Sequence, residues 1–198
     1  MKPYKILYCL NYSSINKEIT YYLENHTELL TKRPKLYANF IDLKKFITLC
    51  PLLAQWAKGL GMTIRDAYFS YCRNRGQNFD EHGDSPCHIH LDKPPVHWKI
   101  NWPVLNMEGS CVRFFELKDK KNNVLDLVER KGDPHSKDHD LWGLDYKHFK
   151  ETCRHDFRNN EPILMDGLVP HDVGLYDDAK FPRIGIQAML VKEPIHLL

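Results

Sequence analysis

The chain has 198 residues, 42% of them hydrophobic, which is enough to bury one core and excludes a globally disordered protein. Its 28 basic side chains nearly balance 26 acidic ones, and this balance argues against a general binder of nucleic acid. The six cysteines have no C-x-x-C spacing, and no apolar run approaches the roughly 18 residues of a membrane span, so neither a zinc knuckle nor a membrane protein is indicated.

The N-terminal segment, residues 1–62, predicts helices and contains no catalytic cluster. Ser14 can cap a first helix. The apolar residues of this helix recur on one face at helical spacing and are Ile15, Ile19, Tyr22, Leu23 and Leu30. A second helix is expected to begin near Pro51, because proline suits the first helical position. We expect both helices to cover one face of a β-sheet.

After residue 62 the pattern changes to short segments in which apolar and polar residues alternate, which is the period of a β-strand. Residues 67–71, 99–105, 111–117 and 183–191 show this pattern most clearly. On the strand 99–105, Lys99 and Asn101 share the face opposite to three apolar side chains, Ile100, Trp102 and Val104. Many short strands separated by turn residues favour a β-sandwich or barrel.

We expect a single domain over residues 1–198, in which a helical cover (1–62) precedes a β-sheet core (63–198). Residues 118–160 are charged and irregular, and are expected as an insertion in this core. The insertion would be a lid, or a solvated excursion with a short helix around Tyr146–Cys153; its His135 and His139 are expected at the surface. Near the N-terminus only Ile6–Leu10 is apolar, far short of a secretory signal, so a cytoplasmic location is predicted.

Two histidines and an aspartate occur at alternate positions in residues 86–92, Pro-Cys-His-Ile-His-Leu-Asp. On a strand, His88, His90 and Asp92 would share one face, with apolar residues on the other. Iron and manganese prefer this mixture of nitrogen and oxygen ligands. The segment therefore predicts part of a metal site, with His88 either as a spare imidazole on the pocket face or as a group that supports the metal ligands.

The chain resembles the Fe(II)- and 2-oxoglutarate-dependent oxygenases, in particular small phage and bacterial members. The resemblance rests on His90-Leu-Asp92, on His171 in Val-Pro-His-Asp-Val, and on Arg183 in Pro-Arg-Ile-Gly-Ile. It extends to the strand of residues 99–106. Together with the strand pattern, it implies an α+β, mainly β fold: a double-stranded β-helix, or jelly-roll, with N-terminal helices packed on one sheet.

This resemblance implies that His90, Asp92 and His171 are the metal ligands and catalytic residues. Fe(II) would then bind 2-oxoglutarate and O2 at its remaining positions, and the products would be succinate, CO2 and a hydroxylated small molecule, amino acid or peptide. Because Asp92 would supply the third protein ligand, no site is left open for a halide, and hydroxylation is favoured over halogenation. Arg183 is expected to bind the remote carboxylate of 2-oxoglutarate through its planar fork. Lys99 is a rival or additional carboxylate partner, with Asn101 beside it.

Family members often carry serine or threonine two residues after this arginine, where the present chain has Gly185. Two alternatives remain open. The first is a cupin-like metalloprotein that uses His88 and His90. The second is a non-catalytic β-sandwich interaction module, in which His90 and Asp92 form a hydrogen-bonded core pair and Arg183 pairs with a nearby acid.

Overall fold

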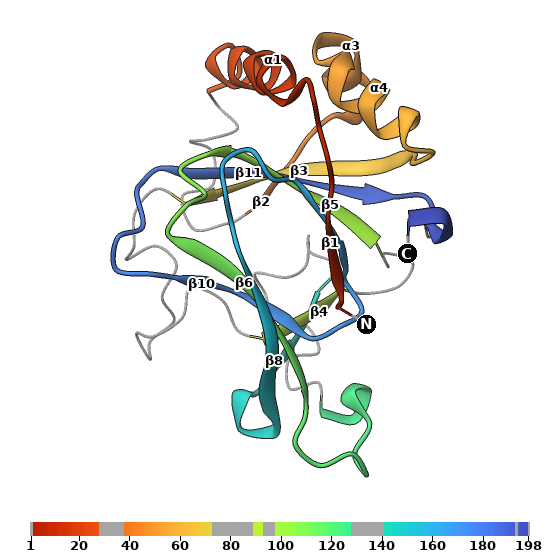
Figure 1. Ribbon diagram of the computed structural model, residues 1–198, viewed down its shortest axis with the longest axis vertical. Coiled ribbons are helices and arrows are strands. Elements are labelled where there is room, and N and C mark those ends of the chain that lie inside the picture. Colours follow the sequence, from red (N-terminus) through yellow and green to blue (C-terminus); the bar gives the residue numbers. More distant parts are fainter. Residues whose placement is uncertain are drawn as a thin grey trace.

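The computed structural model describes residues 2–27, 38–72, 89–92, 98–127, 141–192 and 194–197. Within these residues the chain forms two antiparallel β-sheets that lie face to face, with helices on the outside of one of them (Figure 1). No helix in the described ranges is long and apolar enough to cross a membrane.

The two sheets place strands that are distant in sequence side by side. As far as the structure describes the chain, the larger or major sheet has the order β1 (Tyr4–Ile6), β9 (Ile163–Asp166), β5 (Trp98–Leu105), β11 (Arg183–Leu190), β3 (Ile64–Cys72) and β2 (Ala38–Phe40). The minor sheet has the order β7 (Leu141–Leu144), β4 (Ile89–Asp92), β10 (His171–Leu175), β6 (Ser110–Leu117) and β8 (Phe149–Asp156). Strand β4 therefore lies beside β10 in one sheet, and β5 beside β11 in the other.

Helices α1 (Tyr12–Glu24), α3 (Leu43–Leu49) and α4 (Pro51–Gly59) cover the outer face of the major sheet (Figure 1). The apolar face predicted for α1 is confirmed within the described residues, where its buried members are Ile15, Ile19, Tyr22 and Leu23. The N-cap of this helix is Asn11, so Ser14 lies inside the first turn and does not cap it. Helix α4 begins at Pro51, as predicted.

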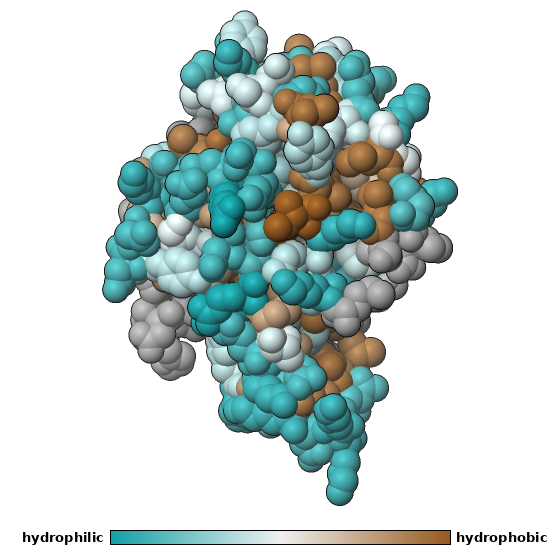
Figure 2. All heavy atoms as spheres, viewed as in Figure 1, coloured by the Kyte–Doolittle hydropathy of each residue, from teal (hydrophilic) through white to brown (hydrophobic). Residues whose placement is uncertain are grey.

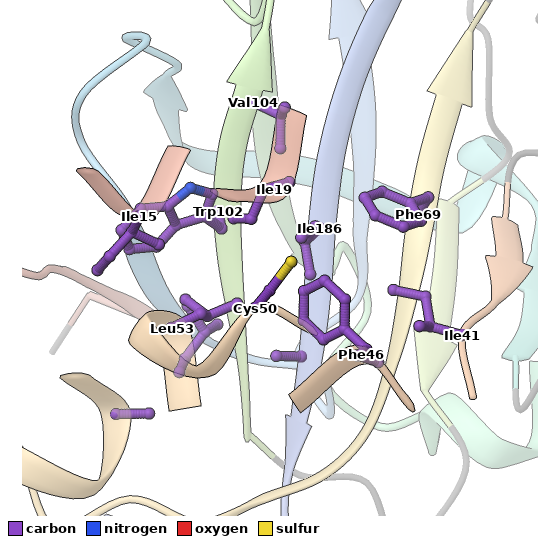
Figure 3. Packing of buried hydrophobic residues seen from close by; sticks show 14 of the residues in the cluster. Ile15, Ile19, Ile41, Phe46, Cys50, Leu53, Phe69, Trp102, Val104 and Ile186 are labelled. Atoms are coloured by element: carbon purple, nitrogen blue, oxygen red, sulfur yellow. The ribbon is translucent and has the colours of Figure 1, made fainter. Parts of the chain in front are cut away.

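Apolar side chains from the helices and from one face of the major sheet form the main core. In Figure 3, Ile19 and Phe46 from the helices point toward Trp102 on β5, Ile186 on β11 and Phe69 on β3. Trp102, Phe46 and Phe69 are fully buried, and each contributes roughly 1.5–3 kcal/mol by leaving water. Alternation along these strands then turns the intervening residues toward the minor sheet.

The inner face of the major sheet is therefore polar at several positions. On β5, Ile100 belongs to the core under the helices, whereas Lys99 and Asn101 face the minor sheet and are nevertheless buried. On β11, the core residue Ile184 follows Arg183, which is also buried. The face separation predicted for residues 99–105 is thus present, and it brings charged side chains between the sheets.

Two parts of the chain differ from expectation. The N-terminal segment contributes β1 and β2 to the major sheet in addition to its helices. Part of the expected insertion 118–160 belongs to the minor sheet, because β7 pairs with β4 and β8 pairs with β6. The helix suggested around Tyr146–Cys153 is only a single 3₁₀ turn, Tyr146–His148, followed by β8. Strand β8 lies at the sheet edge, where exposed charged residues hide the strand pattern.

The surface on the side shown in Figure 1 is mainly hydrophilic, with hydrophobic side chains gathered near its middle and beside the helices (Figure 2). Near the N-terminus, three large hydrophobic residues are exposed: Ile6 on β1, and Tyr8 and Leu10 in the segment that leads to α1. Single exposed apolar residues are common on folded proteins, so these residues indicate no particular partner.

Candidate functional site

Three side chains from distant parts of the sequence converge between the sheets. His90 and Asp92 lie on β4, two residues apart, so both point to the same side of the minor sheet. His171 begins β10 and lies opposite His90 in the antiparallel pair of strands. The two imidazole centroids are 4.1 Å apart, and the potential ligand atoms of the three residues all lie within 4.8 Å of one another. This arrangement is able to hold a metal ion through two nitrogens and one oxygen.

The His171 ring is fixed in the tautomer that such a site requires. Its Nδ1 donates a hydrogen bond to the carbonyl oxygen of Val169 at 2.8 Å, so the lone pair of Nε2 faces the other two residues. Burial, and then electrostatic interaction with His90 and Lys99, hold the pKa of His171 well below its ordinary value. The imidazole is therefore neutral, which is the form that coordinates metal ions.

Asp92 is held by its backbone and by a glycine that leaves room for its carboxylate. The Asp92 amide donates to the Gly167 carbonyl at 2.9 Å. A Cβ atom placed on Gly167 would lie 2.0 Å from Oδ2 of Asp92 and 2.7 Å from its Cγ. Only glycine fits this close approach. The sequence signalled Asp166-Gly167 as a turn, but not that Gly167 shapes the site.

Replacing Gly167 with alanine should therefore weaken metal binding by about 10- to 100-fold, the range seen when groups that orient ligands are altered. The new methyl group would force the Asp92 carboxylate out of its position. Titration with Mn(II), followed by electron paramagnetic resonance, would measure this loss. Gly59→Ala is the matched control, because a Cβ atom at Gly59 meets nothing within 4 Å. Equal Mn(II) affinity in the two variants would contradict the role of Gly167.

Lys99 reaches the same cluster from the major sheet. Its side chain is fully buried, and its Nζ lies 3.1 Å from Oδ1 and 2.8 Å from Oδ2 of Asp92. The same Nζ is 3.2 Å from Nε2 of His171. Oδ2 of Asp92 nevertheless accepts no well-directed hydrogen bond. The sequence suggested Lys99 as a partner of the cosubstrate. In the structure its ammonium group contacts Asp92 and His171, two of the three residues expected to bind the metal.

Arg183 lies at the start of β11 and is also buried. Its Nε donates to Oγ of Ser110 at 2.8 Å, and its guanidinium carbon lies 5.4 Å from the centre of the Phe157 ring. Ser110 in turn donates to the carbonyl oxygen of Met107 at 2.6 Å. The guanidinium is thus oriented by a hydroxyl group that the sequence motifs did not single out.

The structure explains why residue 185 is glycine rather than serine or threonine. A Cβ atom at Gly185 would lie 3.3 Å from the carbonyl oxygen of Trp102 and 3.4 Å from Sδ of Met107. Met107 is itself fully buried, so there is little room for a hydroxyl group here. The hydroxyl beside Arg183 comes instead from Ser110, on the opposite sheet.

Asn101 lies between the Lys99 and Arg183 ends of the inner face. It is two residues from Lys99 along β5, or about 7 Å at the usual strand rise. Its register partner on β11 is Gln187, whose Oε1 accepts a hydrogen bond from the hydroxyl of Tyr68. Asn101 is 4% exposed, and its side chain lies on the same face of β5 as that of Lys99. The side-chain amide is thus placed on the inner face, where it could contact a polar ligand.

A second buried ionic cluster lies behind His171, on the outer face of the minor sheet. The Asp172 carboxylate is fully buried and accepts two hydrogen bonds from Arg113, at 2.8 and 2.6 Å, and one from the Tyr146 hydroxyl. Because Asp172 and Arg113 are cross-strand neighbours, the pair fixes β10 against β6 next to His171. Local sequence patterns do not indicate this cluster, since its three members come from separate segments.

Three histidines considered from the sequence lie outside the described residues: His88, on which the cupin-like alternative depends, His135 and His139.

No protein-family model and no curated protein sequence matches the chain. Several solved structures do. SnoN from nogalamycin biosynthesis, a non-heme α-ketoglutarate-dependent epimerase, aligns with a TM-score of 0.51 and 11% identity over 95% of this chain and 78% of its own. EctD from S. alaskensis, crystallised with 2-oxoglutarate and 5-hydroxyectoine, aligns with a TM-score of 0.50 and 11% identity over 95% of this chain and 71% of its own. A Pseudomonas putida prolyl-4-hydroxylase aligns with a TM-score of 0.49 and 10% identity over 96% of this chain and 93% of its own. The resemblance to Fe(II)- and 2-oxoglutarate-dependent oxygenases is thus confirmed as a likeness of fold.

Proposed function

We propose that the protein is an Fe(II)- and 2-oxoglutarate-dependent dioxygenase that hydroxylates a small molecule, an amino acid or a peptide. The observation that carries the proposal is the buried group of His90, Asp92 and His171, whose potential ligand atoms lie within 4.8 Å of one another in a chain with an oxygenase-like fold. As part of this proposal, we interpret the two facing sheets as a double-stranded β-helix.

The residues fit such a metal. His171 offers a neutral Nε2, and Asp92 offers Oδ2, a buried oxygen without a directed hydrogen bond. A facial set of two histidines and one carboxylate leaves positions for other ligands, which is typical of non-heme iron oxygenases. When bound, Fe(II) and 2-oxoglutarate supply the oxidative decarboxylation that consumes O2 and gives succinate, CO2 and the hydroxylated product.

The protein's own part is to orient the ligands and exclude water. The Val169 carbonyl holds the His171 ring, and Gly167 leaves space for the Asp92 carboxylate. We assign the remote carboxylate of the cosubstrate to Arg183, with Lys99 and Asn101 as further polar partners on the same inner face. Apolar side chains between the sheets keep the reaction space dry, among them Phe114, Ile163 and Met165.

A screen for succinate release tests this proposal. Purified protein is supplied with Fe(II), 2-oxoglutarate and O2, together with libraries of amino acids, nucleosides and peptides. We expect one class of compound to raise succinate formation and to gain the mass of one oxygen atom. A protein that binds neither Fe(II) nor Mn(II) would contradict the proposal and would favour a non-catalytic interaction module.

A further inference from the structure

Lys99 occupies an unusual place for a cation, because its ammonium group contacts the atoms that would bind the metal. It lies 2.8 and 3.1 Å from the two oxygens of Asp92 and 3.2 Å from Nε2 of His171. In the absence of a metal, these contacts compensate the buried carboxylate. The side chain is 1% exposed, so water contributes little to screening its charge.

A divalent cation bound by Asp92 and His171 would lie close to this ammonium group. Two positive charges at such short range, in a dry interior, repel each other strongly. Lys99 has little freedom to withdraw, because its backbone is fixed between β11 and β9 and its side chain is packed in the interior. An anion placed between the metal and the ammonium would remove the repulsion, and would be attracted by both.

We propose that Lys99 makes metal binding depend on the cosubstrate, by opposing the binding of the metal alone and favouring the metal together with a carboxylate ligand. The inference rests on the proposed function, because the carboxylate is that of 2-oxoglutarate. By thermodynamic linkage, the metal and 2-oxoglutarate raise each other's affinity by the same factor. Lys99 is thus a positioning residue that sets the coupling between the two ligands.

The test is a titration of metal-free protein with Mn(II), followed by electron paramagnetic resonance, without and with saturating 2-oxoglutarate. The natural protein should bind Mn(II) much more tightly when 2-oxoglutarate is present. Lys99→Met keeps the length of the side chain but removes its charge. We expect this variant to bind Mn(II) alone about 10-fold more tightly, and to lose about 10-fold of the enhancement by 2-oxoglutarate. Chelation by 2-oxoglutarate itself accounts for the enhancement that remains.

Lys150→Met is the matched control, since it removes an exposed lysine that pairs with Glu116 across β6 and β8. It should behave as the natural protein does. If Lys99→Met binds Mn(II) alone no more tightly and keeps the full enhancement, the role of Lys99 is rejected while the metal site stands. If no protein binds Mn(II) even with 2-oxoglutarate, the proposed function itself fails.

If Lys99→Met does not fold, a second variant can be measured in its place. Lys99→Gln is a second uncharged variant that retains hydrogen-bonding capacity toward Asp92, and the same increase in Mn(II) affinity is expected. The natural protein provides a further check that needs no variant. Equal Mn(II) affinity with and without 2-oxoglutarate would overturn the proposed coupling.

Discussion

Replacing His171 with alanine should abolish succinate formation while leaving the fold intact. The imidazole is one of the two nitrogen ligands proposed, and among the described residues no other histidine, cysteine or carboxylate joins His90 and Asp92 in this group. The variant should also lose Mn(II) binding, because two ligands in place of three no longer define a facial site. Succinate measured by chromatography and Mn(II) measured by titration would report the two losses.

The structural cost of this change should be modest. His171 makes a hydrogen bond to the Val169 carbonyl and approaches Nζ of Lys99, so its removal is expected to cost about 1–3 kcal/mol of unfolding free energy. Circular dichroism should show unchanged secondary structure. His26→Ala is the control, because the Nδ1 of His26 also contacts a backbone carbonyl, that of Tyr22, but His26 lies just after the C-terminal end of α1, outside the sheets. Undiminished turnover in His171→Ala would reject the assignment of the metal ligands.

Much of the inner face of the major sheet was predictable because strands have a simple period. Alternation on residues 99–105 separated Lys99 and Asn101 from the apolar residues that pack under the helices, and the structure has the same separation. The meeting of residues 90, 92 and 171 was suggested by resemblance rather than by periodicity. It depends on the pairing of β4 with β10, which the local sequence does not specify.

Other features depend on packing and could not be read from side-chain chemistry. Gly167 matters because of the space it leaves beside Asp92, and a turn motif does not indicate which group approaches it. Ser110 matters because β6 carries it to the end of β11 where Arg183 lies. Strand β8 was missed because exposed charges on an edge strand resemble those of a loop.

The cluster of Asp172, Arg113 and Tyr146 is a further feature that the local sequence does not predict. His171 and Asp172 are adjacent, yet alternation sends one between the sheets and the other to the outer face. Asp172 is fully buried there and is satisfied by Arg113 and Tyr146. The motif around residue 171 therefore contains one residue for the site and one that anchors the strand carrying it.

Replacing Arg183 with alanine should raise the concentration of 2-oxoglutarate needed for half-maximal turnover by about 100-fold. This factor corresponds to about 3 kcal/mol, as expected when a carboxylate loses a buried, charge-assisted pair of hydrogen bonds. Arg183→Lys keeps the charge but not the planar fork, and should give an intermediate increase. Steady-state measurements of succinate at varied 2-oxoglutarate would provide both values.

Two further measurements separate the binding of the cosubstrate from that of the metal. Mn(II) affinity without 2-oxoglutarate should stay unchanged in Arg183→Ala, because the Arg183 side chain contacts Ser110 and Phe157 and is not part of the group of His90, Asp92 and His171. Ser110→Ala should give a smaller increase in the 2-oxoglutarate requirement, since the guanidinium would lose its orienting hydroxyl but keep its charge. If Arg183→Ala leaves the requirement unaltered, the remote carboxylate binds elsewhere, and Lys99 and Asn101 become its nearest polar candidates on the inner face.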